Sequence, residues 1–176
     1  MLINASDSAL LVVDLQQKLL PAIHDHEVVL AQAVRMATIA GLLGVPVIGT
    51  AQTPDKLGPN HPDVARLCDK ILPKSHFDAC AEGLLPALPT AVRQIIVTGC
   101  EAHICVLQTC LSLLERGYRV LPLLDACSSR KATDRDAAFE RLRQAGATPV
   151  TVEMAAYEWM RDSRHAQFRN VLKLIK

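Results

Sequence analysis

Short apolar runs alternate along the chain with longer segments of helical periodicity. The runs show little polar alternation, which is typical of strands covered on both faces by helices. Six runs separated by helix-sized segments predict βαβ units and a doubly wound, six-stranded parallel sheet. The expected strands are residues 8–14, 45–50, 70–74, 94–99, 119–125 and 147–152.

Three of the intervening segments end at or just before a glycine, as helices do when a left-handed residue closes their last turn. These segments are residues 28–43, 105–115 and 133–145. A further helix is expected over residues 163–175. Residues 53–63 contain three Pro and one Gly, and we expect them to form a loop over the carboxyl ends of the strands.

Length and composition narrow the class of protein. The chain is long enough for one domain, residues 1–176, with a core of its own. A net charge of +1 gives no basic footprint for nucleic acid. No apolar run approaches the ~20 residues of a membrane helix, and residues 1–10 lack a signal-peptide pattern. The sequence therefore predicts a cytoplasmic protein that acts on small molecules, without nucleic acid or membrane as partners.

Ligands of doubly wound sheets bind outside the carboxyl ends of the strands, near the point where the strand order reverses. The predicted strand ends carry Asp14, Gln16, Gln52 and Lys74, and the fourth is followed by the stretch TGCEAHICVLQT, residues 98–109. The chain contains neither a G-x-G-x-x-G nor a P-loop motif, so no nucleotide cofactor is predicted.

The two cysteines at 100 and 105 have three alternative interpretations: a metal site, a nucleophile or apolar packing. A metal site is disfavoured because Cys110 lies about 140° round the helix from Cys105. Cys105 opens a predicted helix, where free N–H groups and the helix dipole would lower the pKa of its thiol. We therefore expect no metal, and we take Cys105 as the candidate nucleophile.

Nucleophilic catalysis also needs a base and a charge that stabilises the proton transfer. Asp14 and Lys74 offer these two roles, since both lie at strand ends that converge in space. Each residue has an ordinary alternative: a buried cysteine, an aspartate that caps a loop, a solvated lysine. Their joint appearance at three ends of one sheet favours the catalytic interpretation.

Three stretches carry a resemblance to a known family: LLVVDLQQKLLPAI, KSHFDAC and IIVTGCEAHICVLQTCLSLLERGYRVLPLLDACSSR. They resemble the isochorismatase-like cysteine hydrolases, and within these the isochorismatase-domain-containing branch. The resemblance runs from about Ser8 to the C-terminus. It implies a Rossmann-like, three-layer α/β/α domain with an Asp-Lys-Cys triad, which corresponds here to Asp14, Lys74 and Cys105.

The resemblance also implies details of the turn after the fourth strand. It suggests a cis peptide bond between Cys100 and Glu101, and an oxyanion hole formed by the backbone N–H groups of Glu101 and Cys105. The metal-binding Asp-x-His pair of the related nicotinamidases is replaced here by Thr50-Ala51-Gln52. Because hydrolysis of isochorismate needs no nucleophilic cysteine, Cys105 favours cleavage of a C–N bond in an amide or carbamate.

Several neighbours of the triad are candidates for substrate binding. Gln16 and Gln52 could hydrogen-bond a substrate amide. Leu19, Phe77 and His103 could line its pocket, although an aromatic residue is often part of a core and a turn histidine often binds the backbone. The segment Cys127 to Arg130 follows the fifth strand, and we expect it to be structural or to lie in an interface, with Cys127 buried.

Two other functions stay open from the sequence. The chain could be a non-catalytic, oligomeric scaffold that retains the triad, since its half-apolar composition allows an apolar surface that mates with a second copy. It could also sense redox state through a disulfide between Cys105 and Cys100 or Cys110, if their Cα atoms come within ~7 Å. The main prediction is that the protein is a cysteine hydrolase that acts on a small molecule and forms a homo-oligomer.

Overall fold

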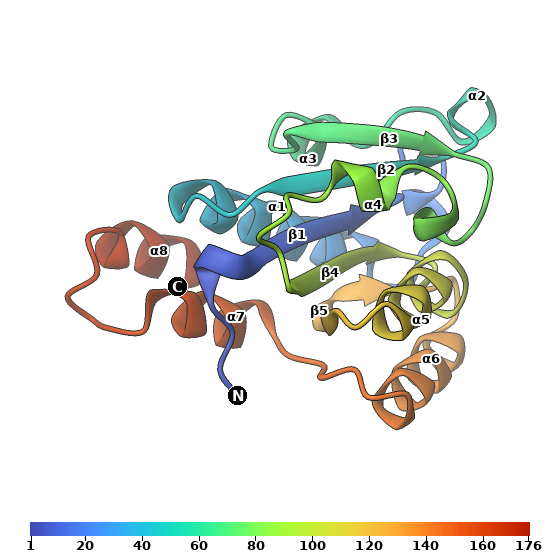
Figure 1. Ribbon diagram of the computed structural model, residues 1–176. Coiled ribbons are helices and arrows are strands. Elements are labelled where there is room, and N and C mark those ends of the chain that lie inside the picture. The colour runs from blue at the N-terminus through green and yellow to red at the C-terminus, as the bar shows by residue number, and fades with distance from the viewer.

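The computed structural model describes residues 1–176, which form a single α/β domain built on a parallel sheet (Figure 1). The sheet has five strands in the order β3-β2-β1-β4-β5, so the strand order reverses between β1 and β4. The strands are β1 (Ser8–Val13), β2 (Val47–Gln52), β3 (Lys70–Lys74), β4 (Gln94–Cys100) and β5 (Arg119–Ser128).

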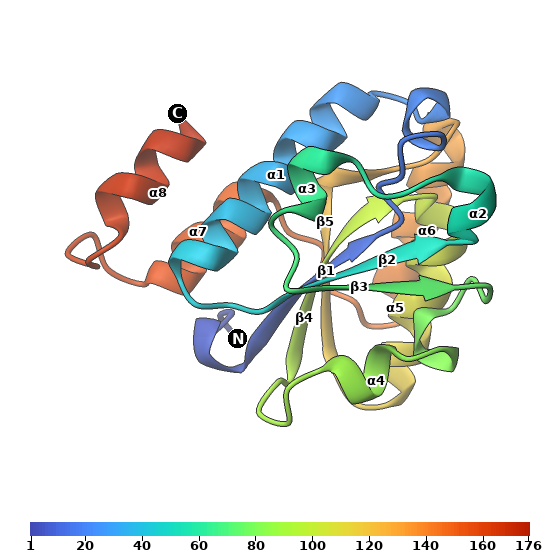
Figure 2. The ribbon, with the colours of Figure 1, turned by 90° about the horizontal axis from the view of Figure 1, so that it is seen from above.

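Helices cover both faces of this sheet (Figure 2). One face is covered by α1 (His26–Leu42) and α7 (Val152–Met160), with α8 (Phe168–Ile175) packed against these two helices, and the other by α4 (Leu84–Ala87), α5 (Leu107–Glu115) and α6 (Ala132–Gln144). Short helical turns complete the chain: η1 (Ala5–Asp7), η2 (Leu20–Ala22), α2 (Pro54–Leu57), α3 (Pro62–Ala65), η3 (Ala79–Ala81) and the π-helical turn η4 (Ala102–Val106). None of the helices has the length and apolar character needed to span a membrane.

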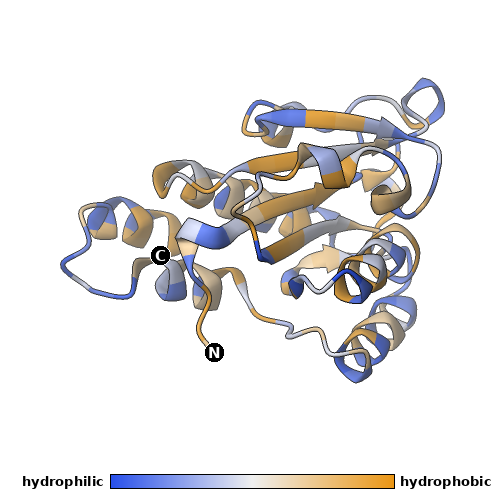
Figure 3. Ribbon diagram, viewed as in Figure 1, coloured by the Kyte–Doolittle hydropathy of each residue, from blue (hydrophilic) through white to orange (hydrophobic).

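The central strand β1 shows why the apolar runs fold in this way. All six of its residues are buried. Leu10 and Val12 pack into the core under α1 and α7, whereas Leu11 and Val13 pack into the core under α5 and α6. A strand between two helical layers needs apolar side chains on both faces, and the hydropathy colouring shows this apolar centre (Figure 3).

The predicted sixth strand, residues 147–152, is wrong. Thr148 and Val150 donate backbone hydrogen bonds to β5, and Leu124 of β5 donates one to Val150, but only Leu123 and Val150 form a bridge and no continuous ladder joins this segment to the sheet. Pro122 of β5 has no N–H to donate to this segment, so the pairing is interrupted there. Just beyond Val150, Thr151 caps α7 by accepting a hydrogen bond from the N–H of Met154, so the chain turns into a helix.

The four predicted helices are present, although their ends differ from the predicted ones. The helices predicted over 28–43 and 133–145 are α1 and α6, and each is closed by a left-handed glycine, Gly44 or Gly146. The C-terminal helix starts later than predicted, at Phe168, because Asp162 and His165 hold the preceding residues in turns. The helix predicted from Cys105 begins at Leu107, after the π-helical turn η4.

Candidate active site

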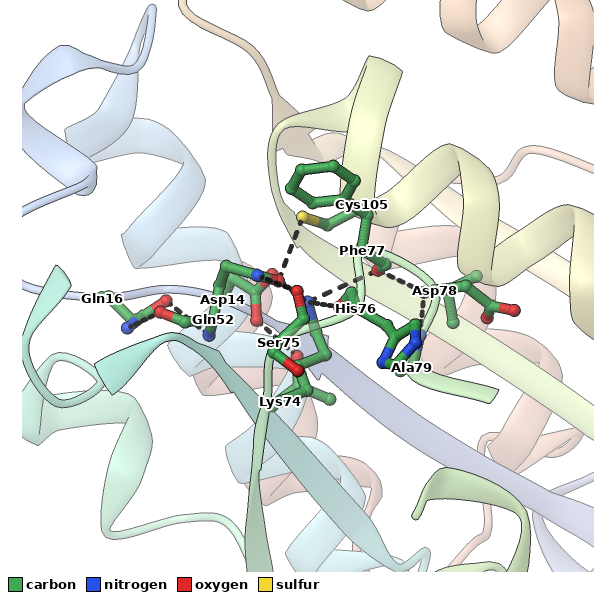
Figure 4. Close-up of polar contacts among 12 residues, drawn as sticks. Asp14, Gln16, Gln52, Lys74, Ser75, His76, Phe77, Asp78, Ala79 and Cys105 are labelled. Atoms are coloured by element: carbon green, nitrogen blue, oxygen red, sulfur yellow. Dashed lines mark hydrogen bonds and ion pairs between the residues drawn. The ribbon is translucent and has the colours of Figure 1, made fainter. Parts of the chain in front are cut away.

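Asp14 and Lys74 form a buried ion pair at the reversal point of the sheet (Figure 4). Asp14 follows β1 and Lys74 is the last residue of β3. The Lys74 Nζ lies 2.8 Å from the Asp14 Oδ2, and both side chains are inaccessible to solvent. Thr50 donates to the other carboxylate oxygen, Oδ1, at 2.7 Å. Asp14 also has a left-handed backbone (φ 52°), which is unusual for a residue with a side chain and is frequent at functional sites.

Gln52 links this ion pair to Cys105. Its Oε1 accepts a hydrogen bond from the Lys74 Nζ at 2.6 Å and lies 3.9 Å from the Cys105 Sγ. Its Nε2 donates to the carbonyl of Ser75. The structure thus brings the side chains of Asp14, Lys74 and Cys105 into one cluster, with Gln52 as the link between the ammonium and the thiol.

The segment of residues 53–63, predicted as a loop and containing the short helix α2, supports Gln52 and Thr50 through hydrogen bonds. Gln16 accepts from the N–H of Gln52 and donates to the carbonyls of Gln52 and Gly58. Asn60 donates to the Thr50 carbonyl at 3.1 Å. Gln16 is fully buried by these contacts, so its amide supports the site and is not free to face a substrate.

The remaining predicted neighbours lie in different environments. Phe77 is half-exposed, and its ring projects towards the side of the site on which Cys105 lies (Figure 4). Leu19 packs against the core on the α1 face. His103 contacts residues that follow β5: its Nδ1 lies 2.9 Å from the Ser129 Oγ and its Nε2 3.9 Å from an oxygen of Asp134.

The turn between β4 and α5 places Cys105 next to Asp14. Gly99 has a φ of 149°, and a Cβ there would overlap the Val13 carbonyl, so only glycine lets β4 pass this close to the end of β1. The predicted cis bond between Cys100 and Glu101 is wrong, since every peptide bond is trans. The chain reverses instead through Glu101, which adopts the left-handed conformation (φ 56°, ψ 62°).

The pKa of the Cys105 thiol is raised to about 12, first by burial and then by the Asp14 carboxylate, and the Lys74 ammonium partly opposes this rise. The prediction that a helix start would lower this pKa is therefore wrong for the resting protein. Cys105 is the fourth residue of η4, inside the turn, and not at the free N-terminus of α5. The resting sulfur carries its proton and needs a base.

The other cysteines are also free thiols. Cys100, Cys110 and Cys127 are buried, and burial raises the pKa of each thiol. Cys127 is buried as predicted. No group of three or more His, Cys, Asp or Glu side chains is arranged to hold a metal ion.

Two charge changes should move the reactivity of Cys105 in opposite directions. Asp14→Asn removes a group that raises the thiol pKa and leaves Lys74, so labelling by iodoacetamide at pH 8 should accelerate about tenfold for each unit by which the pKa falls. Lys74→Met should slow it for the converse reason. In the wild-type protein the labelling rate should keep rising with pH up to about 12. Peptide mapping reports the rate at Cys105, and equal rates in all three proteins would contradict this electrostatic assignment.

The isochorismatase domain model matches residues 8–154, a span that includes the whole cluster. The chain belongs to the isochorismatase family. Among curated relatives, human isochorismatase domain-containing protein 2 is 37% identical over 96% of this chain and 83% of its own length. The mouse protein 2A is 36% identical over 96% and 82%. The resemblance of the sequence to this family is thereby confirmed, and it places the chain in the isochorismatase-like hydrolase superfamily.

Solved structures agree with this assignment. The MAR1 ribonuclease from Caenorhabditis elegans is 38% identical, with a TM-score of 0.95 over 99% of this chain and 92% of that one. YcaC from Pseudomonas aeruginosa, in a structure with hexane-2,5-diol and covalent acrylamide, is 27% identical, with a TM-score of 0.91 over 98% and 91%. The three-layer fold is thus shared over nearly the whole chain.

Sequence reasoning missed two supports of the cluster. Thr50, which binds Asp14, stood in the Thr50-Ala51-Gln52 stretch after the second strand, but its hydroxyl gave no signal of a partner 36 residues away. Arg130 lies 2.6 Å from a carboxylate oxygen of Glu101, although it follows the fifth strand, which was expected to stand apart from the site. Pairs of residues this far apart in sequence leave no local sequence pattern from which their contact could be predicted.

Proposed function

We propose that this protein is a cysteine hydrolase that cleaves a C–N bond of a small amide or carbamate through a thioester on Cys105. The observation that carries the proposal is the buried Asp14–Lys74 pair with the Cys105 thiol beside it. The Asp14 carboxylate interacts with the Cys105 thiol, so it can accept the proton that this sulfur must lose before it attacks.

In the first half-reaction, the Cys105 sulfur attacks the substrate carbonyl while its proton passes to the Asp14 carboxylate. The carbonyl electron pair moves to the oxygen, and backbone N–H groups of Glu101 and Cys105 stabilise the resulting oxyanion. When the tetrahedral intermediate collapses, the C–N bond breaks and Asp14 returns the proton to the leaving nitrogen. The Lys74 ammonium compensates the charge of Asp14 before the transfer, and again once Asp14 has returned the proton.

In the second half-reaction, water attacks the thioester and gives a proton to Asp14. Collapse breaks the C–S bond and releases a carboxylic acid from an amide or a carbonic acid monoester from a carbamate, and the sulfur regains its proton from Asp14. Gln52 fixes the position of the Lys74 Nζ relative to the sulfur, because its Oε1 contacts both. Phe77, the one exposed aromatic residue near the cluster, would form a wall of the substrate pocket.

The covalent acrylamide in the YcaC structure supports this proposal, because acrylamide is an electrophile that adds to thiols. A second candidate activity comes from the C. elegans relative, which is called a ribonuclease. The net charge of +1 makes the chain a weak match for a polyanionic substrate. The non-catalytic scaffold is the third alternative.

A screen that compares small amides, carbamates and a single-stranded RNA distinguishes the three alternatives. We expect at least one amide or carbamate to be hydrolysed, with an acyl adduct on Cys105 visible by intact mass, and Cys105→Ala to abolish that turnover while the fold persists. Cys110→Ala, which removes a buried cysteine that lies outside the cluster, is the matched control. Cleavage of the RNA alone, unaffected by Cys105→Ala, would replace this proposal with the ribonuclease activity.

A further inference from the structure

Glu101 controls the position of Cys105 through its backbone. Its carbonyl accepts hydrogen bonds from the N–H of Ile104 at 2.9 Å and from the N–H of Val106 at 3.3 Å. These two residues flank Cys105 in the chain. The orientation of the Glu101 peptide therefore sets where η4 holds the sulfur.

The side chain of Glu101 is in an unfavourable setting for a carboxylate. It is 9% exposed, and its Oε2 is buried without a hydrogen-bond partner. The His103 Nδ1 lies 3.5 Å from this oxygen but is closer, at 2.9 Å, to the Ser129 hydroxyl. A buried carboxylate needs a counter-charge to remain in place.

Arg130 supplies that counter-charge from a different strand end. Its Nε lies 2.6 Å from the Glu101 Oε1, and it follows β5, whereas Glu101 follows β4. The guanidinium is half-exposed and can keep its hydration while it binds the buried oxygen. The ion pair thus ties the exit of β5 to a left-handed residue that would otherwise be free to relax.

We infer that Arg130 is a positioning residue: it compensates the Glu101 carboxylate, which holds the η4 turn and, through it, the Cys105 sulfur in the orientation used for attack. The last part of this inference rests on the proposed function. The first part, that Arg130 maintains the turn, does not depend on any activity of the protein.

Amide hydrogen exchange measured by NMR tests the turn directly. We expect Arg130→Met to accelerate exchange of the Ile104 and Val106 amides by about tenfold or more, while the Val12 amide in β1 keeps its wild-type rate. Arg130→Lys should restore both amides to within about threefold of wild type, because it retains the charge. Arg141→Met, which removes an exposed arginine of α6, is the control and should change neither amide.

A double variant tests whether Arg130 acts on the turn through the charge of Glu101. If Arg130 acts by compensating the Glu101 charge, then Glu101→Gln combined with Arg130→Met should bring the two amides back to within about threefold of wild type. Wild-type protection of Ile104 and Val106 in Arg130→Met would overturn the inference. So would equal acceleration of Val12, which would indicate a general loss of stability.

The rate at which p-nitrophenyl acetate acylates Cys105, followed by intact mass, measures how Arg130 affects the reactivity of the sulfur. Arg130→Met should slow this acylation by about tenfold, and Arg130→Lys should restore it. If exchange responds as expected and the wild-type protein is never acylated at Cys105, the proposed function fails while the role of Arg130 in the turn stands. If the wild-type protein is acylated and Arg130→Met is acylated equally fast, the link from turn to sulfur is refuted.

Discussion

Lys74→Met should lower the free energy of unfolding by about 3–5 kcal/mol, because it leaves the Asp14 carboxylate buried without its counter-charge. Both side chains are inaccessible to solvent, so water cannot replace the lost ammonium. Thr50 would remain as a donor to one carboxylate oxygen, but a single neutral hydrogen bond does not compensate a buried charge. Urea unfolding at pH 7 measures this loss.

Two further variants make the Lys74 result specific. Lys70→Met removes an exposed lysine from the same strand and should change stability by no more than about 0.5 kcal/mol. Asp14→Asn combined with Lys74→Met removes both charges and should be more stable than Lys74→Met alone. If the double variant is less stable than Lys74→Met, the ion pair is not the origin of the effect.

Gly99→Ala should destabilise the protein by about 3 kcal/mol or more, since the new methyl group would overpack the junction of β4 and β1. Its Cβ would overlap the Val13 carbonyl and lie 2.7 Å from the Val13 Cβ. The obstacle is backbone of the central strand, which cannot move without displacing Asp14, the next residue. We therefore expect loss of activity even in the fraction that folds.

Gly117→Ala is the matched control for this substitution. Gly117 also has a positive φ, of 81°, but a Cβ there would meet nothing within 4 Å. It should cost only the backbone penalty of about 1–2 kcal/mol. Equal destabilisation by the two substitutions, measured by urea unfolding, would show that the close approach of β4 to β1 is not what requires glycine at position 99.

Much of the architecture was predictable from the sequence because buried parallel strands leave a plain signal. The predicted runs 8–14, 70–74 and 94–99 correspond to β1, β3 and β4, and the rule that ligands bind at strand ends already grouped Asp14, Lys74 and Cys105. The run at 147–152 has the same apolar character. It forms no continuous ladder because Pro122 of β5 lacks an N–H and because Thr151, near the end of the run, caps α7, and the apolar composition of a run reveals neither effect.

The sequence predicted which residues form the cluster better than it predicted the charge state of Cys105 and the orientations of the side chains around it. The charge state of Cys105 depends on how deeply η4 is buried and on its separation from Asp14, neither of which a helix-start pattern contains. Gln52 was predicted as a possible partner of a substrate amide, and its contacts with Lys74 and the sulfur had no signal in the sequence. His103 lies two residues from Cys105 in sequence, yet it turns towards Ser129. Such orientations are set by tertiary contacts.

The fate of an acyl group on Cys105 shows whether this cysteine is the nucleophile and Asp14 the base that activates water. After mixing with p-nitrophenyl acetate, intact mass and peptide mapping should find an acetyl group on Cys105 that the wild-type protein then loses. In Asp14→Asn the acetyl group should persist at least about 100-fold longer, because water has lost its base. No acetyl group on Cys105 in either folded protein, or its loss at the same rate from both, would contradict the account.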